Sequence, residues 1–483
     1  MQPPSTSTSD RRAELDELAR KSADVIVRAA ERRSPILLVT HFDADGLSAG
    51  SITLTAVRRL GASLHQRVVE SLSEDVVEDL GQIDSELIVL TDMGSGQLAL
   101  LEKGFREKEV VVADHHQSLG EPAKNTHHFN PHTVGYDGST VISGAGTAYL
   151  LAKAIDERNK DLSPMALVGC LGDQQDKGPQ RKLRGLNADI LRDAIELNLV
   201  EETQDLILFG RQTRPIHRAI ASTTSPFLPG LSGEEDRCLA LLDKAHVPTK
   251  IDEKWRTISD LSTDEKQRLV DGIIQHMMAL KLSGEKALEL IGSVYTLVKE
   301  DPWTPLRDGR EFATLLNSCG RMGRASLGLA LGLGERGAAF KEAELVYSEY
   351  KKSLATYMNW LTTSPGALIR EENLVIVRGE GVIDENMTGA VSSIVSSSNL
   401  FGTGKVTLVI TTRKDGAVKI SARATDNLVS MGVNLGKILQ TLTADYGGSG
   451  GGHAIAAGAT VDKDKLDGFL ATFERTIDSV LLH

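Results

Sequence analysis

The sequence predicts an α/β protein with three parts: a doubly wound parallel sheet, a helical insert or linker, and a smaller α/β region. From residue 35 to 195, short runs of Val, Ile and Leu alternate with helical hydrophobic patterns, which is typical of strand–helix–strand units. Over residues 196–303, Leu, Ile and Met recur at helical spacing among charged residues. Strand-like runs return within residues 304–483. A chain of 483 residues is long enough for two or three domains.

Residues 1–34 are predicted to form a disordered tail followed by a helix. The first ten residues are rich in Ser, Thr and Pro, a composition typical of disorder. From Arg11 to Arg33 the apolar residues follow a helical spacing. We therefore expect an amphipathic helix to pack ahead of the first strand.

The composition argues against several classes of protein. No apolar run reaches the roughly 18 residues of a membrane span, and no signal-peptide pattern opens the chain, so we expect no membrane partner and a cytoplasmic location. The three cysteines, Cys170, Cys238 and Cys319, lie far apart without a CxxC pair. They are interpreted as core thiols and not as a zinc site or a disulfide framework.

The charge balance bears on nucleic-acid binding. A net charge of −12 argues against a protein that coats duplex DNA, because phosphates are bound by Lys and Arg. A narrow channel needs only a local basic lining. Two arginine groups could supply that lining or could equally belong to a solvated surface: Arg211, Arg214 and Arg218, and Arg321 with Arg324.

Four apolar segments of the region 35–195 each end in Asp or His. The carboxyl ends of parallel strands meet at one edge of a sheet, where α/β proteins bind their ligands. Carboxylate oxygens and imidazole nitrogens there suit a divalent cation. Strand alternation is expected to point the first three residues in one direction, although an Asx turn with a helix cap is the alternative for that stretch. The residues are His41, Asp43 and Asp45; Asp92; Asp114, His115 and His116; and Asp173.

A further stretch, Ser143-Gly-Ala-Gly146, precedes a helical pattern. Its backbone N–H groups would be available to an anion at the start of that helix. A loop without any ligand is the alternative.

The polar motifs resemble the four motifs of the DHH phosphoesterase superfamily, in the order His41-x-Asp43-x-Asp45-Gly46, Asp92, Asp114-His115-His116 and Gly172-Asp173. The later Gly450-Gly-Gly-His453-Ala-Ile-Ala-Ala-Gly458 resembles the signature of the companion DHHA1 domain. Together they resemble RecJ-type single-strand nucleases, and most closely the archaeal RecJ-like enzymes that associate with GINS. The resemblance implies a DHH catalytic domain at 35–195 and a DHHA1 substrate-binding domain at 304–483, joined by the helical insert.

The resemblance also implies roles for the motif residues. Two divalent ions are expected, with Mn²⁺ preferred and Mg²⁺ as the alternative. Asp92 would bridge them, because it comes alone from its strand end and a carboxylate bridges easily. His116 would face the scissile phosphate as a cation or proton donor, and Asp114 would orient a neighbouring imidazole. The remaining ligands would be His41 and Asp43 for the first ion, and Asp45, His115 and Asp173 for the second. His41 departs from bacterial members of the family, which often carry Asp there.

Substrate-binding residues are expected in the last part of the chain. Asn317, Arg321, Ser421 and Arg423 have the context that most resembles the DHHA1 fold. The glycine run, with Gly450, Gly451 and Gly452 before His453, predicts an anion site at a helix terminus. A flexible hinge is the alternative for this run.

The function expected from these features is a metal-dependent exonuclease that acts on single-stranded DNA or RNA and releases mononucleotides during replication or repair. GINS or other replisome proteins are the expected partners. Two alternatives belong to other classes. One is a DHH phosphodiesterase or pyrophosphatase that acts on short oligonucleotides or small phosphates. The other is a replisome scaffold without catalysis, for which a complete ligand set would be unnecessary.

Overall fold

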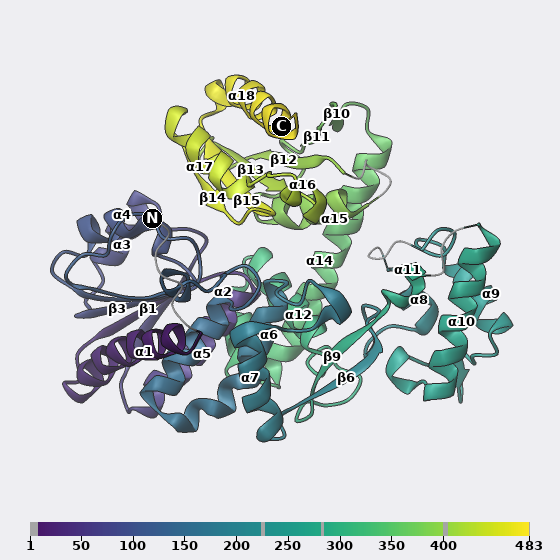
Figure 1. Cartoon of the computed structure of the whole chain (residues 1–483), viewed down its shortest axis with the longest axis horizontal. Helices are drawn as coiled ribbons and strands as arrows, with labels where there is room; N and C mark the ends of the chain where they lie inside the picture. The colour runs from purple at the N-terminus through teal and green to yellow at the C-terminus, as the bar shows by residue number, and fades with distance from the viewer. Residues whose placement is uncertain (1–7, 224–227, 282–284, 399–403, 483) are drawn as a thin grey trace. The chain divides into compact units, whose positions relative to one another are not determined.

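The computed structural model describes residues 8–223, 228–281, 285–398 and 404–482 (Figure 1). Most of the predicted disordered tail lies outside these residues. Contacts divide the chain into two compact units, Met1–Val346 and Tyr347–His483. All three cysteines are buried and free, as predicted. Among the described residues, no helix has the length and apolar character needed to cross a membrane.

The first unit contains a five-stranded parallel sheet in the order β2-β1-β3-β4-β5. Every neighbouring pair of strands is parallel. The middle strands β1 and β3 are rich in Leu, Ile and Val and are buried almost throughout, as a parallel sheet covered on both faces requires. The strands are β1 (Ile36–His41), β2 (Leu64–Val69), β3 (Leu87–Thr91), β4 (Glu109–Ala113) and β5 (Thr126–Phe129).

Helices cover both faces of this sheet (Figure 1). Leu37, Val39 and Leu90 point to one face and pack against α3 and α4. On the other face α1, α2 and α5 contact the strands, and α5 contacts both α1 and α2. The doubly wound arrangement predicted from the sequence is therefore confirmed. The helices of this unit outside the insert are α1 (Thr8–Glu31), α2 (Ala44–Arg59), α3 (Glu74–Gly81), α4 (Leu98–Gly104), α5 (Gly144–Ile155), α6 (Ser163–Gly172), α7 (Gly185–Glu196), α12 (Gly309–Arg321) and α13 (Ala325–Gly332).

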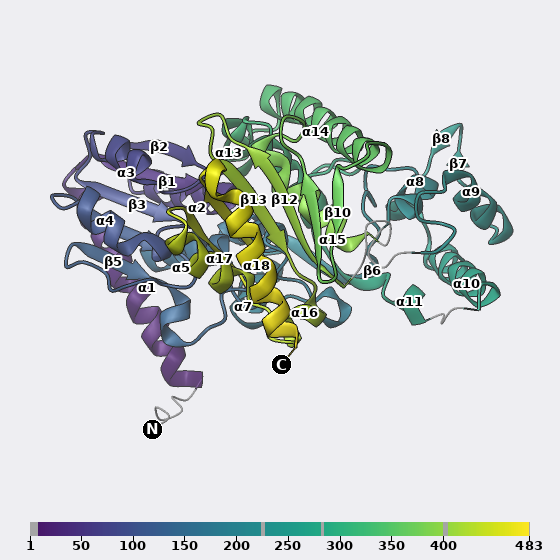
Figure 2. The same ribbon diagram turned by 90° about the horizontal axis from the view of Figure 1, so that it is seen from above.

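The second unit contains a mixed six-stranded sheet in the order β10-β11-β12-β13-β15-β14. Helices α17 and α18 lie over the sheet in Figure 2, and Phe469 and Phe473 of α18 belong to the core that these helices share with the strands. Helix α15 contacts β12 and β13. The division between the units falls within α14 (Ala338–Thr363). The elements are β10 (Leu368–Arg370), β11 (Leu374–Arg378), α15 (Thr388–Ser397), β12 (Val406–Thr412), β13 (Val418–Arg423), α16 (Asp426–Ser430), α17 (Leu435–Asp445), β14 (Ser449–Gly452), β15 (Ala456–Val461) and α18 (Leu466–Leu481).

The glycine run of the second unit does not lead into a helix. Its residues Gly450, Gly451 and Gly452 form β14, which pairs with β15 in antiparallel register. The neighbouring helix N-terminus belongs to α17, whose first two N–H groups donate to the carbonyls of Ala454 and His453, at 3.0 and 3.1 Å. The prediction of a helix-terminus anion site is therefore wrong, because the chain's own carbonyls already accept these hydrogen bonds. Phosphate binding by the glycines and His453 stays a prediction.

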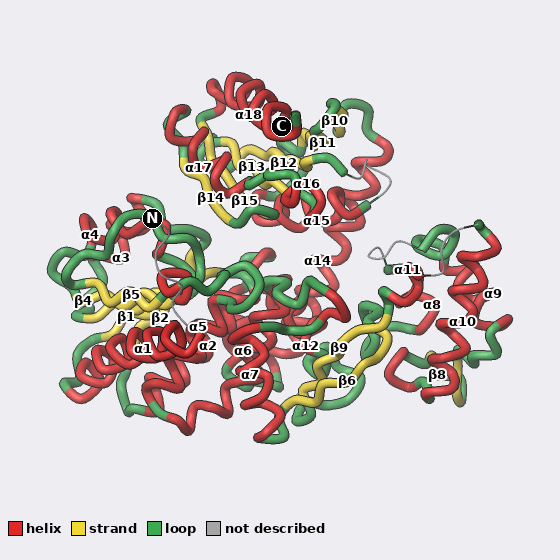
Figure 3. Tube along the Cα trace, in the orientation of Figure 1, coloured by secondary structure: helices red, strands yellow, loops and turns green. Residues whose placement is uncertain are grey.

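The insert of the first unit forms a lobe with its own core. Leu242, Ile273 and Met277 lie in a buried cluster that is separate from the sheet. Two antiparallel strands, β6 and β9, which the helical spacing did not predict, border this insert lobe, residues 207–290 (Figure 3). The elements of the region are β6 (Val200–Leu206), α8 (Ile216–Ala221), α9 (Glu235–Lys244), β7 (Lys250–Ile251), β8 (Lys254–Trp255), α10 (Thr263–Ala279), α11 (Glu285–Leu288) and β9 (Ile291–Leu297).

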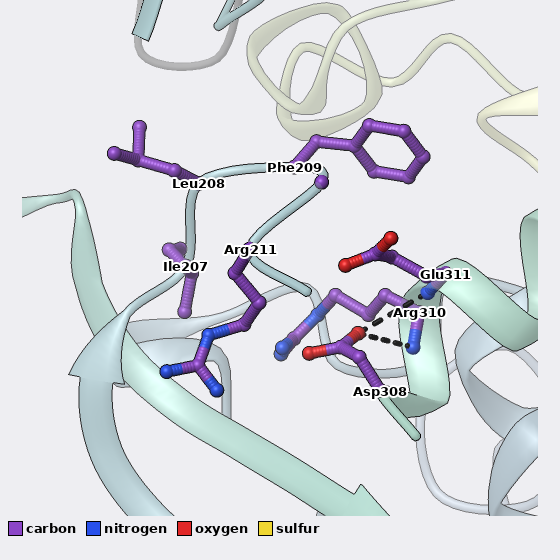
Figure 4. Close-up of a pocket in the computed structure, with 8 residues that line it drawn as sticks. Ile207, Leu208, Phe209, Arg211, Asp308, Arg310 and Glu311 are labelled. Atoms are coloured by element: carbon purple, nitrogen blue, oxygen red, sulfur yellow. Dashed lines mark hydrogen bonds between the residues drawn. The ribbon is translucent and has the colours of Figure 1, made fainter. Parts of the chain in front are cut away.

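A buried carboxylate joins the insert lobe to α12. The N-cap residue Asp308 accepts hydrogen bonds from the backbone N–H groups of Arg310 and Glu311, at 2.9 and 3.1 Å (Figure 4). The Glu311 carboxylate accepts a hydrogen bond of 2.9 Å from the backbone of Gln212, at the start of the lobe. A small cavity of about 20 Å³ lies beside these groups. Burial, reinforced by the Asp308 charge, raises the pKa of Glu311 to about 7.

Candidate metal centre

The loop between β1 and α2 supplies the first group of polar residues. The strand ends at His41 and the helix begins at Ala44, so Asp43 is the N-cap and accepts a hydrogen bond of 3.0 Å from the Gly46 backbone. Asp43 and Asp45 lie after the end of the strand, so strand alternation does not set the direction of their side chains. The prediction that alternation points all three residues the same way is therefore wrong for Asp43 and Asp45. The helix cap, which was the alternative to a metal site, is present together with a cluster of metal-capable groups.

His41, Asp43 and Asp92 form one such cluster. The His41 Nδ1 atom lies 3.1 Å from Asp43 Oδ1 and 3.7 Å from Asp92 Oδ2. One ligand atom from each of the three residues fits within a span of 4.8 Å. Burial lowers the pKa of His41, but the two carboxylates outweigh it and raise the pKa to about 9. A cation bound here would have to displace the His41 proton.

Asp45, His115 and Asp173 form a second cluster, whose ligand atoms also lie within 4.8 Å of one another. The His115 Nδ1 atom donates to the Gly138 carbonyl at 2.6 Å, which leaves Nε2 as the nitrogen that faces the carboxylates. This Nε2 atom lies 3.7 Å from Asp45 Oδ2 and 3.3 Å from Asp92 Oδ1. Metal-binding histidines are usually fixed in this way by their second nitrogen.

Asp92 lies between the two clusters. Its Oδ1 approaches His115 and its Oδ2 approaches His41, so the two oxygens face different groups. The residue is buried and has a positive φ of 60°. A Cβ on Gly144 would come within 2.2 Å of Asp92 Oδ1, so the close approach of α5 requires glycine there. This geometry is what a bridging ligand needs, and the bridging role itself stays a prediction.

Hydrogen bonds hold the buried carboxylates in place. The Asp45 oxygens accept from the backbone N–H groups of Gly144 and Ala145, at 2.8 and 2.9 Å, so the anion at the start of α5 is a side chain of this chain. Asp173 accepts from the Gln175 side chain at 2.8 Å. Burial raises the pKa of Asp45, and the nearby carboxylates raise it further. Several buried carboxylates that repel one another fit a divalent cation, because its charge would offset the repulsion.

Asp114 and His116 form a pair beside these clusters. Asp114 accepts from the Ser95 backbone at 2.9 Å and from His116 Nδ1 at 2.7 Å. Burial raises the pKa of Asp114, but His116, His115 and the Ser95 amide lower it below its ordinary value overall. Burial likewise lowers the pKa of His116, and Asp114 more than offsets this, so the pKa is raised. Asp114 therefore orients His116 and favours its protonated form.

Helix α12 packs directly on the loop of the first motif. The Asn317 Oδ1 atom accepts a hydrogen bond of 3.0 Å from the Ala44 backbone. A Cβ on Gly320 would lie 1.8 Å from the Phe42 carbonyl, so this contact requires glycine. The structure thus places Asn317 and Arg321, at the end of the same helix, in the first unit, next to the metal-capable residues.

The other predicted substrate residues lie in the second unit. Ser421 and Arg423 lie on β13, and the Ser421 hydroxyl donates to Thr388 Oγ1 at 2.8 Å. The predicted division at 303/304 does not coincide with the boundary between the compact units after Val346. The predicted boundaries of the four parts of the chain stay a prediction.

Much of the predicted basic lining is paired with carboxylates. Arg211 forms an ion pair with Asp205, and Arg218 forms one with Glu235 at 3.2 Å. Arg324 lies 4.0 Å from a carboxylate of α14. Arg218 and Arg324 therefore fit the alternative interpretation, in which they belong to a solvated surface, whereas Arg211 is a buried member of an ion pair.

Sequence comparisons identify the family. Three domain families match the chain: "DHH family, N-terminal domain" at residues 35–172, "DHH-CID domain" at 208–291 and "DHHA1 domain" at 372–479. The "Uncharacterized protein MJ0831" of Methanocaldococcus jannaschii is 30% identical over 454 residues, which cover 92% of this chain and 94% of that protein. The chain belongs to the DHH phosphoesterase superfamily.

Other proteins match shorter stretches of the chain or share only its fold. The "Single-stranded-DNA-specific exonuclease RecJ" of Haemophilus influenzae is 29% identical over 156 residues, which cover 29% of this chain and 26% of that protein. The crystal structure of RecJ from Thermus thermophilus in complex with Mn²⁺ aligns with a TM-score of 0.57 at 19% identity, over 96% of this chain and 55% of the other. CDC45 from Entamoeba histolytica aligns with a TM-score of 0.63 at 11% identity, over 96% and 99%.

The sequence predictions are confirmed at the level of the family and the fold. The mixed α/β architecture has a parallel-sheet DHH domain, a helical region and a C-terminal DHHA1 domain. A DHH-family phosphoesterase is supported by the same matches.

Sequence reasoning missed two residues that position the metal-capable groups, Gly138 and Gln175. It also missed the contact that Asn317 makes with the loop of the first motif. Gln175 lies two residues after Asp173, and this short spacing could have indicated that its side chain contacts the Asp173 carboxylate. No spacing rule connects Asn317 to a loop 273 residues earlier. That contact became visible only in the folded chain.

Proposed function

We propose that this DHH phosphoesterase is a two-metal exonuclease of single-stranded nucleic acid that releases mononucleotides from a strand end. The observation that carries the proposal is the position of Asp92 between two clusters, His41 with Asp43 on one side and Asp45, His115 and Asp173 on the other. A carboxylate that turns one oxygen toward each cluster is the arrangement expected of a bridging ligand.

The residues divide the chemistry between them. Two divalent ions held by these residues would supply Lewis-acid chemistry, which activates a water and stabilises the charge that develops on a phosphodiester. His116, held by Asp114 with its pKa raised, would donate a hydrogen bond or a proton to the scissile phosphate. The mixed imidazole and carboxylate donors suit manganese, with magnesium as the alternative.

The substrate class is supported by a relative. The Haemophilus influenzae protein is named as specific for single-stranded DNA, and it is 29% identical to this chain over 156 residues. Arg423 and the β14 glycines of the second unit are proposed to hold the phosphate backbone, as the sequence predicted. A role in DNA replication or repair belongs to the same proposal.

The test is product analysis with manganese on single strands that carry a label at the 5′ or the 3′ end, made of DNA or of RNA. The expected result is labelled mononucleotide released first from one end only, because the reaction starts at a terminus. A circular strand of the same length is the matched control, and efficient cutting of the circle would exclude the exonuclease. Faster turnover of pyrophosphate or of very short oligonucleotides would favour the small-substrate DHH enzyme.

The same assay separates the enzyme from a replisome scaffold without catalysis. A scaffold would release no mononucleotide with any divalent ion. The set of metal-capable residues, brought together from four separate motifs, favours the enzyme.

We further propose that replication proteins such as GINS dock on the insert lobe or on the second unit. The metal-capable groups of the proposed centre come from outside the lobe, so the lobe itself carries none of the proposed catalytic residues. Co-purification with GINS should be lost when both the lobe and the second unit are deleted. Association that survives this double deletion would contradict the docking proposal.

A further inference from the structure

A groove in the insert lobe lies between α9 and α10 and shares no residue with the metal centre. Its volume is about 540 Å³, which is within the range of ligand sites. Small residues line it, including Ala240, Ala245 and Gly272. A Cβ on Gly272 would approach the Ala245 Cβ to 3.3 Å, so the two helices pack closely at this point. Apart from two histidines, no residue of the lining has an aromatic ring.

Cationic side chains from both helices surround the groove. Arg237 and Lys244 come from α9, and Arg268 comes from α10. The Arg237 guanidinium and the His276 ring both lie near Gly230, which places them at one end. Since Arg237 and Lys244 are seven residues apart on a helix, they lie about 10 Å apart along its axis. The groove therefore presents positive charge at more than one point along its length.

These cations differ from others in the lobe. In the described part of the chain, Arg237, Lys244 and Arg268 form no ion pair, and all three are exposed. Asp271, the acidic residue of the lining, accepts a hydrogen bond of 3.0 Å from Gln267 on its own helix. Five other cations of the lobe are paired with carboxylates, namely Arg211, Arg218, Lys250, Arg256 and Lys266. Arg214 and Lys254 also have no carboxylate partner among the described residues, but they lie outside the groove.

The charge of the lobe also differs from that of the whole chain. Residues 207–290 contain 12 Lys and Arg and 12 Asp and Glu, whereas the chain has a net charge of −12. An anion that approaches this neutral lobe meets unpaired cations at the groove without the repulsion of a strongly acidic surround.

We propose that this groove binds the sugar–phosphate backbone of single-stranded nucleic acid, as a second anchor for the strand whose end reaches the metal centre. The inference rests on the proposed function, since it concerns the same substrate. Permanent cations spaced along a groove suit successive phosphates, and contacts to phosphates carry no base information, so binding should be independent of base sequence. An acidic protein segment fits less well, because the lining has no Trp, Tyr, Phe or Met, the apolar residues that are enriched in protein interfaces.

The groove should make a measurable contribution to binding. Each phosphate contact on a single strand adds about 0.7 to the slope of log K against log salt. Loss of three contacts should reduce the slope by about 2, so the weakening of affinity between roughly 50 and 200 mM salt should be about 20-fold smaller. A short strand that reaches only the metal centre should be unaffected by the groove.

The experiment compares two triple variants of the full chain. Arg237→Ala/Lys244→Ala/Arg268→Ala removes the groove cations, and Arg218→Ala/Lys250→Ala/Lys254→Ala removes the same charge from the same lobe outside the groove. Binding of a fluorescent oligothymidylate of about 30 nucleotides is measured by anisotropy at several salt concentrations without divalent metal, so that no cleavage occurs. A fluorescent oligoglutamate peptide is measured in the same way.

The slope for the long strand should fall only in the groove variant. With manganese, both variants should cleave a strand of about 5 nucleotides at the wild-type rate, because the groove shares no residue with the metal centre. Circular dichroism of both variants should match the wild type, because the replaced side chains lie at the surface of the lobe.

Four outcomes decide the inference. An unchanged slope for the groove variant overturns it, and so does an equal fall in both variants. Loss of peptide binding without any loss of binding to the long strand also overturns it and assigns the groove to a protein partner. A groove-dependent slope in a protein that cleaves no strand with manganese would support the groove and contradict the proposed nuclease.

Discussion

The DHH region, residues 35–172, and the insert lobe place their charges in opposite ways. At the metal centre, buried carboxylates face one another and are oriented by backbone N–H groups, as Asp45 is by Gly144 and Ala145. In the lobe, five cations are paired with carboxylates, and the groove cations are left exposed to solvent. A buried cluster of like charge is costly without a counter-ion, whereas an exposed charge costs little. A buried cluster of like charges is therefore a stronger indication of a bound ion than a set of exposed charges.

Replacement of Asp92 should have the largest effect, because this residue faces both clusters. We expect Asp92→Ala to lower turnover on single strands by on the order of 10³-fold or more with manganese. Manganese at about 100 times its Kd should stabilise the wild-type protein by about 2.7 kcal/mol, and the variant should lose most of this stabilisation in a thermal melt.

The control for this replacement is Asp79→Ala, which removes an exposed carboxylate from α3 of the same region. It should preserve both the turnover and the manganese-induced shift. Near-normal activity of Asp92→Ala would show that the buried carboxylates do not bind the catalytic metal. It would contradict the conclusion that their burial indicates a bound ion.

The two regions also differ in how far their chemistry could be predicted from the sequence. The metal-capable residues follow apolar runs, and the rule that parallel strands present their carboxyl ends at one edge was enough to bring Asp92 and His115 together. The glycine run was misassigned because residues without side chains show no alternation, so β14 looks like a loop. The groove could not be predicted, because a paired arginine such as Arg218 and an unpaired one such as Arg237 look alike in a sequence.

Asn317 provides a smaller test of the metal centre, because it acts through the loop and not as a ligand. Its Oδ1 atom accepts the Ala44 N–H at 3.0 Å and so fixes the turn between Asp43 and Asp45. We expect Asn317→Ala to weaken manganese binding by about 10-fold, which is typical of residues that orient ligands. Calorimetric titration with manganese measures this, and Thr314→Ala, one turn earlier on α12, is the matched control. Equal affinities for the two variants would show that the contact is only structural.

Glu311 tests the junction between the lobe and α12, where we expect an effect on stability and none on the chemistry. It is a buried carboxylate whose pKa is raised to about 7, mainly by burial and then by Asp308. The folded protein holds the proton more tightly than the unfolded chain, whose ordinary pKa is about 4.5. Stability should therefore be unaffected by this group below about pH 4.5 and should fall as the pH rises from there to about 7, by up to about 3 kcal/mol.

Glu311→Gln should abolish that part of the pH dependence, since a neutral amide can still accept the Gln212 N–H hydrogen bond. Urea unfolding at about pH 5 and about pH 8 should show that the free energy of unfolding of the variant rises relative to that of the wild type as the pH rises. Glu344→Gln, an exposed carboxylate replacement on α14, should follow the wild type at both values. Parallel curves for Glu311→Gln and the wild type would mean that the junction tolerates an ionised carboxylate, as a solvated surface does, and that burial without a counter-ion is not costly there.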